Sequence, residues 1–250
     1  MAEKTFAELL QQSSDESRTA DSTLNERLKA LADEIASRNP EFTAVVERMI
    51  ARLQANDVGQ TAPDIGDPMP DFILPDESGA LVRLETLLEA GPVVVSFHRG
   101  HWCPYCKLNA EGLAQIVPEI RRLGAQIVAI SPETHRYGAE LKSAANAAFP
   151  ILSDIDNGYA LELNLLFWVG DEKRQAMTAI GHDIAPFQGN ETWMLPIPAT
   201  FVVGRDGLVK ARYIDPDYRR RMELDDIVAA VAALGTASEA APDRRHRSAS

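Results

Sequence analysis

The stretch Pro-Val-Val-Val-Ser-Phe-His-Arg-Gly-His-Trp-Cys-Pro-Tyr-Cys, residues 92–106, places two cysteines directly after an apolar run. Residues 92–97 are largely β-branched and uninterrupted by charge, which is typical of a strand buried on both faces. A helix is expected to follow Cys103 and to continue to about Leu123, where Gly124 supplies a stop signal. The sequence therefore predicts a buried strand that leads into a helix beginning at Cys-x-x-Cys.

Cys103 and Cys106 are the only two cysteines of the chain, three positions apart. At a helix start, unpaired N–H groups and the helix dipole favour a negatively charged sulfur. Helix N-termini and neighbouring cations lower a cysteine pKa from about 8.5 to roughly 3.5–7.5. We therefore predict Cys103 as the reactive thiolate, Cys106 as the resolving thiol and Arg99 as the supporting cation. Trp102 is expected to shield the sulfurs.

Two other readings of the cysteine pair stay open at this point. The pair could be inert and buried, although such a pair would not need a position between strand and helix. Structural zinc requires four ligands, and one Cys-x-x-Cys supplies two. A mixed site with His98 and His101 would make the chain a copper or zinc chaperone. We predict neither a metal nor another cofactor.

The charge balance restricts the possible partners. There are 37 acidic residues against 25 Lys and Arg, a formal net charge of −12. This charge opposes binding to a phosphate backbone, so no nucleic acid partner is expected. The first residues lack a secretory signal pattern, and no apolar run approaches the roughly 20 residues of a membrane helix. We expect a cytoplasmic protein without a membrane partner.

The chain divides into three regions. Residues 1–60 are expected to form an N-terminal helical extension, because Thr23 and Glu26 fit a capping box and Asn39-Pro40 fits a second helix start. Residues 66–234 should form the main domain. The Ala/Ser-rich and then basic residues 236–250 are expected to be a disordered tail.

The main domain alternates strands and helices. This alternation, followed by a β-hairpin and a closing helix, predicts an α/β fold with a mixed central sheet flanked by helices. Strands are expected at 72–74, 81–84, 92–97, 126–130, 149–152, 200–203 and 209–213. Helices are expected after Cys103, from Ser131-Pro132 to Ala145, at 157–163, within the inserted segment 167–193, and at 224–234.

Several motifs together resemble a known family. The strand–Cys-x-x-Cys–helix arrangement is similar to thioredoxins and glutaredoxins, and its flanks resemble the alkyl hydroperoxide reductase/thiol-specific antioxidant family, the peroxiredoxins. The family-like segments are Gly66-Asp67-Pro68-Met69-Pro70-Asp71-Phe72, residues 92–97, residues 99–106, Phe149-Pro150-Ile151-Leu152-Ser153-Asp154 and Pro198-Ala199-Thr200-Phe201-Val202-Val203. The resemblance implies a thioredoxin-like fold and spans roughly residues 66–234.

The resemblance also has two departures. On the family spacing Pro-x-x-x-Thr/Ser-x-x-Cys, Arg99 replaces the proline, Cys103 replaces the hydroxyl residue, and Cys106 takes the peroxidatic position. That alignment implies the reverse order of attack. Where peroxiredoxins carry an arginine before a later strand, this chain has Ile197-Pro198, so Pro198 resembles the cis-proline that lies against the redox pair of thioredoxins.

The resemblance implies a thiol peroxidase as the leading function. Its substrate would be hydrogen peroxide or an organic hydroperoxide, and thioredoxin or glutaredoxin would reduce the resulting disulfide. A protein-disulfide reductase is the enzymatic alternative, and the metal chaperone is the binding alternative. A homodimer is a further expectation.

Overall fold

The computed structural model describes residues 22–239, and its centre is a mixed five-stranded sheet in the order β5-β4-β3-β8-β9. β3 (Val93–Phe97) lies in the middle, parallel to β4 (Gln126–Ser131) and antiparallel to β8 (Ala199–Val203). β5 (Ile151–Ser153) extends the parallel half, and β9 (Val209–Ile214) extends the antiparallel half. Every residue of β3 is buried, as the run of β-branched residues predicts.

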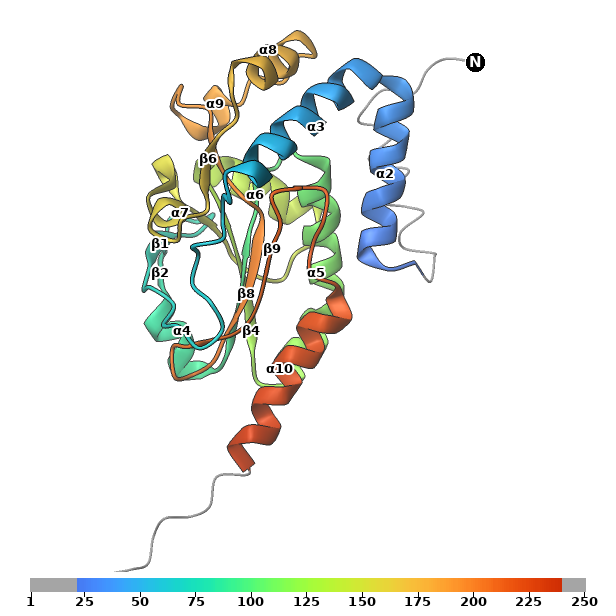
Figure 1. The fold of residues 1–250 in the computed structure, drawn as a ribbon. Coiled ribbons are helices and arrows are strands. Elements are labelled where there is room, and N and C mark those ends of the chain that lie inside the picture. Colours follow the sequence, from blue (N-terminus) through green and yellow to red (C-terminus); the bar gives the residue numbers. More distant parts are fainter. Residues whose placement is uncertain (1–21, 240–250) are drawn as a thin grey trace, which may run out of the picture.

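Helices cover both faces of this sheet (Figure 1). Alternate side chains of β3 point to opposite faces, so Val94 packs in one apolar core while Val93 and Val95 pack in the other. The Val94 face is covered by α5 (Pro104–Arg122), α6 (His135–Ala144) and α10 (Leu224–Glu239). The opposite face is covered by α4 (Leu84–Ala90) and by α7 (Gly158–Glu162), which follows directly on the short helix η1 (Ile155–Asn157).

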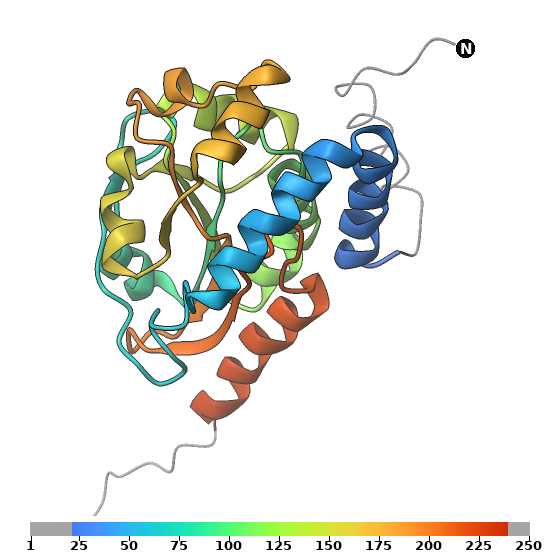
Figure 2. The same cartoon turned by 45° about the horizontal axis from the view of Figure 1, so that its top comes forward.

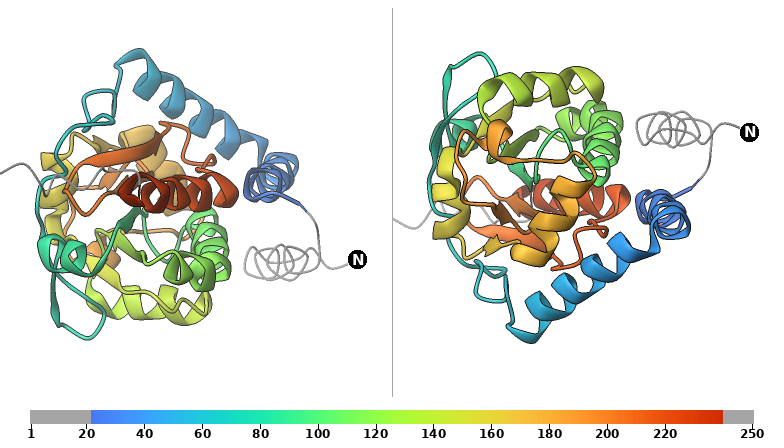
Figure 3. Two further views of the ribbon diagram at one scale, coloured as in Figure 1. Left: turned by 90° about the horizontal axis from the view of Figure 1, so that it is seen from below. Right: turned by 90° about the horizontal axis from the view of Figure 1, so that it is seen from above.

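The predicted helical extension is present as α2 (Leu24–Arg38) and α3 (Pro40–Ala55). Thr23 and Glu26 form the expected capping box, and the Asn39 side chain accepts a hydrogen bond from the Phe42 amide at 2.9 Å. α2 lies alongside α5, and α3 runs across the molecule towards the inserted segment (Figure 2). Figure 3 shows α2 nearly end-on at the edge of the molecule, beside α5.

The inserted segment is built from short elements. β6 (Leu166–Trp168) and β7 (Met194–Pro196) pair antiparallel at its base, and α8 (Asp171–Ala179) and α9 (Ala185–Gln188) lie between them. A separate hairpin, β1 (Ile73–Pro75) and β2 (Leu81–Arg83), matches the expected one. α8 packs against α3, so the insertion and the extension meet on one side of the molecule.

Two boundary predictions are wrong. Ser131 does not cap a helix: it is the last residue of β4 and pairs with Ser153, and the helix begins only at His135 after Thr134. Strand pairing across the sheet therefore overrides the local cap signal. α10 continues to Glu239, so the first residues of the expected tail are helical. The rest of that tail and residues 1–21 lie outside the described residues.

No helix between residues 22 and 239 is long and apolar enough to cross a membrane.

Candidate active site

The turn between β3 and α5 places the two cysteines. Gly100 adopts a φ of +143°, and a Cβ there would lie 2.5 Å from Trp102 Nε1 and 2.7 Å from the Glu133 carboxyl group. Only glycine fits this position without displacing its neighbours. The turn delivers Cys103 as the N-cap of α5, with Pro104 as the first helical residue.

The two sulfurs lie together below the protein surface. Cys103 is 1% exposed and Cys106 is fully buried, and both are free thiols. The Arg99 amide donates to Cys106 Sγ at 3.3 Å, and Arg221 Nη2 donates to the same sulfur at 3.6 Å. One short turn therefore holds two thiols against two arginines.

This environment gives the two thiols different pKa values. Burial by itself disfavours a thiolate at Cys103, but the hydrogen bond from Cys106 and the charges of Arg99 and Arg221 outweigh burial and lower the pKa of Cys103 to about 6. Burial and the neighbouring Cys103 sulfur raise the pKa of Cys106 well above its ordinary value. At neutral pH the pair therefore carries one thiolate, on Cys103, and one thiol, on Cys106.

Arg99 and Trp102, both singled out from the sequence, lie in this cluster. The Arg99 guanidinium is buried, with its Cζ 3.7 Å from the centroid of the Tyr218 ring and 4.9 Å from that of Trp102. Aromatic faces stabilise a desolvated cation and hold it in place. The two rings thus keep the Arg99 charge beside Cys103.

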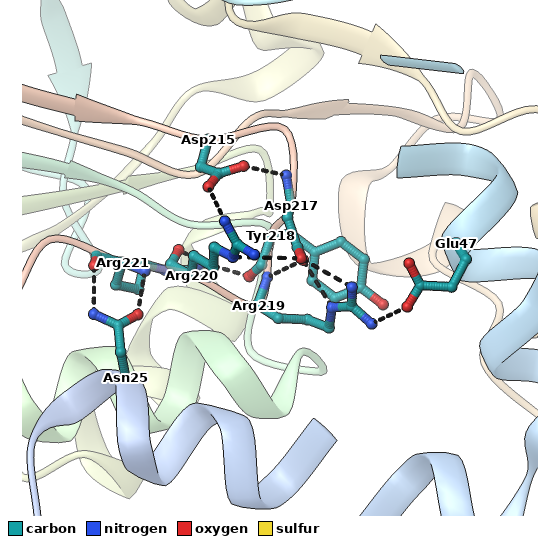
Figure 4. A network of polar contacts seen from close by, with 8 residues as sticks. All are labelled: Asn25, Glu47, Asp215, Asp217, Tyr218, Arg219, Arg220 and Arg221. Carbon is teal, nitrogen blue, oxygen red and sulfur yellow. Dashed lines mark hydrogen bonds and ion pairs between the residues drawn. The ribbon is translucent and has the colours of Figure 1, made fainter. Parts of the chain in front are cut away.

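Sequence analysis missed the loop that follows β9. Arg221 and Tyr218 both come from it, and both are buried. Asn25 of α2 fixes Arg221 by accepting from its amide at 3.0 Å and donating to its carbonyl at 2.8 Å, as Figure 4 shows. Arg219 donates to Glu47 of α3 at 2.6 Å. The sequence shows only the cluster Tyr218-Arg219-Arg220-Arg221, in which Arg220 is 65% exposed, and nothing in that pattern marks Tyr218 and Arg221 as buried.

Pro198 is buried between β7 and β8, but its predicted cis peptide bond is wrong. No cis peptide occurs among residues 22–239. The Ile197 amide donates to the Leu165 carbonyl at 2.8 Å, and Ala199 already pairs with Ile214 of β9. An extended chain with a trans peptide bond before Pro198 connects the Ile197–Leu165 hydrogen bond to the Ala199–Ile214 pairing.

The two histidines near the cysteines are engaged by other groups. His98 is buried with Nε2 3.1 Å from both Ser96 Oγ and Asn109 Nδ2, and burial lowers its pKa to about 4. His101 Nδ1 lies 2.7 Å from the buried Glu133 carboxylate, which also accepts from the His101 amide at 2.6 Å. In the part of the chain that the structure describes, no three His, Cys, Asp or Glu side chains are grouped so that they could hold a metal ion.

A cavity of about 250 Å³ lies in front of Cys103. α2 and α3 form one wall, α8 forms another, and the loop after β9 completes it. The Cys103 sulfur lies at the bottom with Arg99, whereas Cys106 does not line the cavity. The cavity wall includes the side chains of Ile35, Arg38, Phe42, Lys173, Met177 and Arg219.

A strand–Cys-x-x-Cys–helix unit in a mixed sheet flanked by helices is the arrangement of the thioredoxin-like fold. The model of the AhpC/TSA family matches residues 65–212, more than half of the chain, and the chain belongs to that family. Two solved structures show the same fold. Peroxidoxin BcpB from Mycobacterium tuberculosis has a TM-score of 0.54 and 24% identity over 69% of this chain and 98% of its own. A mutant of peroxiredoxin 6 of Arenicola marina has a TM-score of 0.55 and 16% identity over 72% and 79%.

Curated relatives carry peroxiredoxin names. The Mycobacterium tuberculosis protein Rv1608c is 32% identical over 100 residues, which make up 40% of this chain and 65% of that protein. The 1-Cys peroxiredoxin PER1 of Hordeum vulgare is 24% identical over 182 residues, 70% of this chain and 74% of its own. The chain thus spans slightly less than two thirds of the first of these relatives.

Proposed function

We propose that the protein is a thiol-dependent peroxidase that reduces hydrogen peroxide or organic hydroperoxides at Cys103. The observation that carries this proposal is a thiolate with a pKa of about 6 at the bottom of a cavity, beside a second thiol and a buried arginine. Membership of the AhpC/TSA family supports it.

The reaction has two steps. The Cys103 thiolate attacks the outer peroxide oxygen, an S–O bond forms and the O–O bond breaks; the sulfur is oxidised to a sulfenic acid, and the leaving alkoxide or hydroxide takes up a proton. The Cys106 thiol then attacks the Cys103 sulfenic acid, which releases water and forms the Cys103–Cys106 disulfide. Arg99 holds the thiolate in its ionised form and faces the charge that develops on the leaving oxygen.

Recycling requires an external dithiol, for which thioredoxin or glutaredoxin is the proposed class. Because Cys103 is 1% exposed beneath α2 and α3, exchange with a protein dithiol requires these helices to move. His98 Nε2 and His101 Nδ1 are held by Ser96 and Glu133, and the other His98 ring nitrogen, Nδ1, is buried, which speaks against a metal chaperone.

The test sets three reactions side by side. In stopped flow, one equivalent of hydrogen peroxide should convert two titratable thiols to none, without a covalent dimer on a non-reducing gel. Insulin reduction measures the alternative disulfide reductase activity, and zinc or copper titration measures the alternative metal binding. Two free thiols remaining after excess peroxide would refute the peroxidase, and fast insulin reduction alone would identify a disulfide reductase. The homodimer and the cytoplasmic location stay predictions; sedimentation tests the first.

A further inference from the structure

One lysine in the cavity has no role in the chemistry described above. Lys173 of α8 is 2% exposed, and its Nζ has no hydrogen-bond partner among residues 22–239. Nζ lies 3.5 Å from the centroid of the Phe42 ring of α3. The charged groups that act on it most are Arg99, Cys103 and Arg219, none of them a carboxylate.

The cavity contains more buried cations than anions. Arg219 pairs with Asp217 and Glu47, and Arg38 pairs with Glu34. The Cys103 thiolate is the anion that faces Arg99. The Cys103 thiolate also attracts Lys173, but it already faces Arg99, and no carboxylate among residues 22–239 bonds to Lys173 Nζ.

Burial explains how a lysine without a paired anion is accommodated in the cavity, because burial favours its neutral form. Burial lowers the pKa of Lys173 to about 6, assisted by the positive charge of Arg99, so the amine is mostly neutral at pH 7. An anion placed beside it would restore the ammonium form. In a cavity whose other walls include Ile35, Phe42 and Met177, such a pair is poorly screened and strongly attractive.

We infer that the cavity binds hydroperoxides that carry a carboxylate on a short apolar chain, with the carboxylate on Lys173 and the peroxide at Cys103. This inference rests on the proposed peroxidase function and names its substrate class. The lysine supplies one positive charge, which matches the single negative charge of a carboxylate. The apolar wall of the cavity matches the carbon chain. A volume of about 250 Å³ corresponds to roughly eight water molecules, which fits a chain of about six carbons.

The kinetic test compares 6-hydroperoxyhexanoate with its methyl ester, which lacks the negative charge and is larger by one methyl group. The wild-type protein should prefer the acid by at least tenfold in kcat/KM, and Lys173→Met should bring this ratio close to one. Arg174→Met is the matched control, because Arg174 is the next residue of the same helix and is exposed, and it should keep the wild-type ratio. A wild-type ratio near one overturns the inference while leaving the peroxidase intact.

A second readout does not depend on turnover. Hexanoate should slow alkylation of Cys103 by iodoacetamide in the wild-type protein, and calorimetry in buffers of different ionisation enthalpy should show close to one proton taken up per hexanoate at pH 8. Methyl hexanoate should give no proton uptake. Hexanoate that neither protects Cys103 nor takes up a proton overturns the inference even if Lys173→Met does not fold. Binding without any peroxide reduction would refute the proposed function and not the site.

Discussion

The part of the chain matched by the family model and the parts outside it contribute different things to one site. Residues 65–212 supply the sheet, the glycine turn and both cysteines. α2, α3 and the loop after β9 lie outside the match, yet they supply Arg221, Tyr218 and much of the cavity wall. The comparison indicates that the family part supplies the cysteines of the proposed redox site and that the additional parts enclose them and place charge beside them.

The additional parts are joined to each other as well as to the cysteines. Glu223 accepts hydrogen bonds from the amides of Leu24 and Asn25, both at 3.0 Å, and so caps α2 from the far end of the loop after β9. Asn25 in turn fixes Arg221 beside Cys106. The position of a charge at the redox pair therefore depends on the docking of α2.

The largest effect is expected within the family part. Cys103→Ser should slow the reaction with peroxide by ~10³-fold or more, the scale on which loss of a catalytic nucleophile acts. Cys106→Ser should keep a fast first turnover and accumulate a sulfenic acid that a dimedone probe traps by mass spectrometry. A wild-type rate in Cys103→Ser would instead make Cys106 the attacking residue, as the family spacing implies.

The next effect concerns the enclosure. Leu28 of α2 is fully buried in the cluster that contains both cysteines, and Leu28→Ala should cost about 2–5 kcal/mol of packing. Because α2 shields the site, iodoacetamide should alkylate Cys103 faster in this variant.

The matched control is Leu141→Ala on α6, which is equally buried but packs in a different core. It should lower the unfolding midpoint in urea to a similar extent and leave alkylation under native conditions unchanged. Equal acceleration in both variants would show that Cys103 becomes accessible only by global unfolding, and that the extension has no special role.

A smaller effect should distinguish the two arginines. The wild-type rate with peroxide should rise with pH through about 6 and level off above, because the reactive form is the deprotonated one. Arg99→Met and Arg221→Met each remove a cation, which raises the pKa of Cys103 by about one unit or more. At pH 6 the thiolate fraction then falls from about half to about a tenth, so the rate drops about fivefold.

At pH 9 the Cys103 thiol is ionised in both variants, so Arg221→Met should approach the wild-type rate, whereas Arg99→Met should keep a smaller loss because Arg99 also faces the charge on the leaving oxygen. The control is Arg220→Met, whose side chain is 65% exposed and which should leave the profile unchanged. If only Arg99→Met shifts the profile, the electrostatics of the site belong to the family part alone, and the loop after β9 contributes packing only.

The sequence predicted the family part well because its signals are local. The β-branched run, the cysteine spacing and the two helix-start signals at Thr23/Glu26 and Asn39-Pro40 each determine a few neighbouring residues, and the structure contains the strand, the helix and the helical extension they indicate. The roles of Arg221, Tyr218 and Lys173 are not local. Each reaches the site through packing between segments far apart in the chain, which no spacing pattern records. The cis-proline prediction was wrong for the same reason, because pairing on both sides of Pro198 determines its geometry.

The smallest effect is expected for an exposed ion pair between α3 and the loop after β9. Glu47 of α3 pairs with Arg219 at 2.6 Å, but its side chain is 54% exposed and Arg219 keeps a second partner in Asp217. A solvent-exposed pair of this kind contributes less than ~1 kcal/mol, so Glu47→Gln should barely shift the urea midpoint. Glu172→Gln, which breaks the exposed pair between α8 and Arg48 of α3, should leave that midpoint unchanged.

If Glu47→Gln instead accelerated Cys103 alkylation as strongly as Leu28→Ala, the charge pair and not the apolar packing of α2 would hold the enclosure closed. In that case 1 M salt, which screens exposed charges to about 3 Å, should open the wild-type site as well.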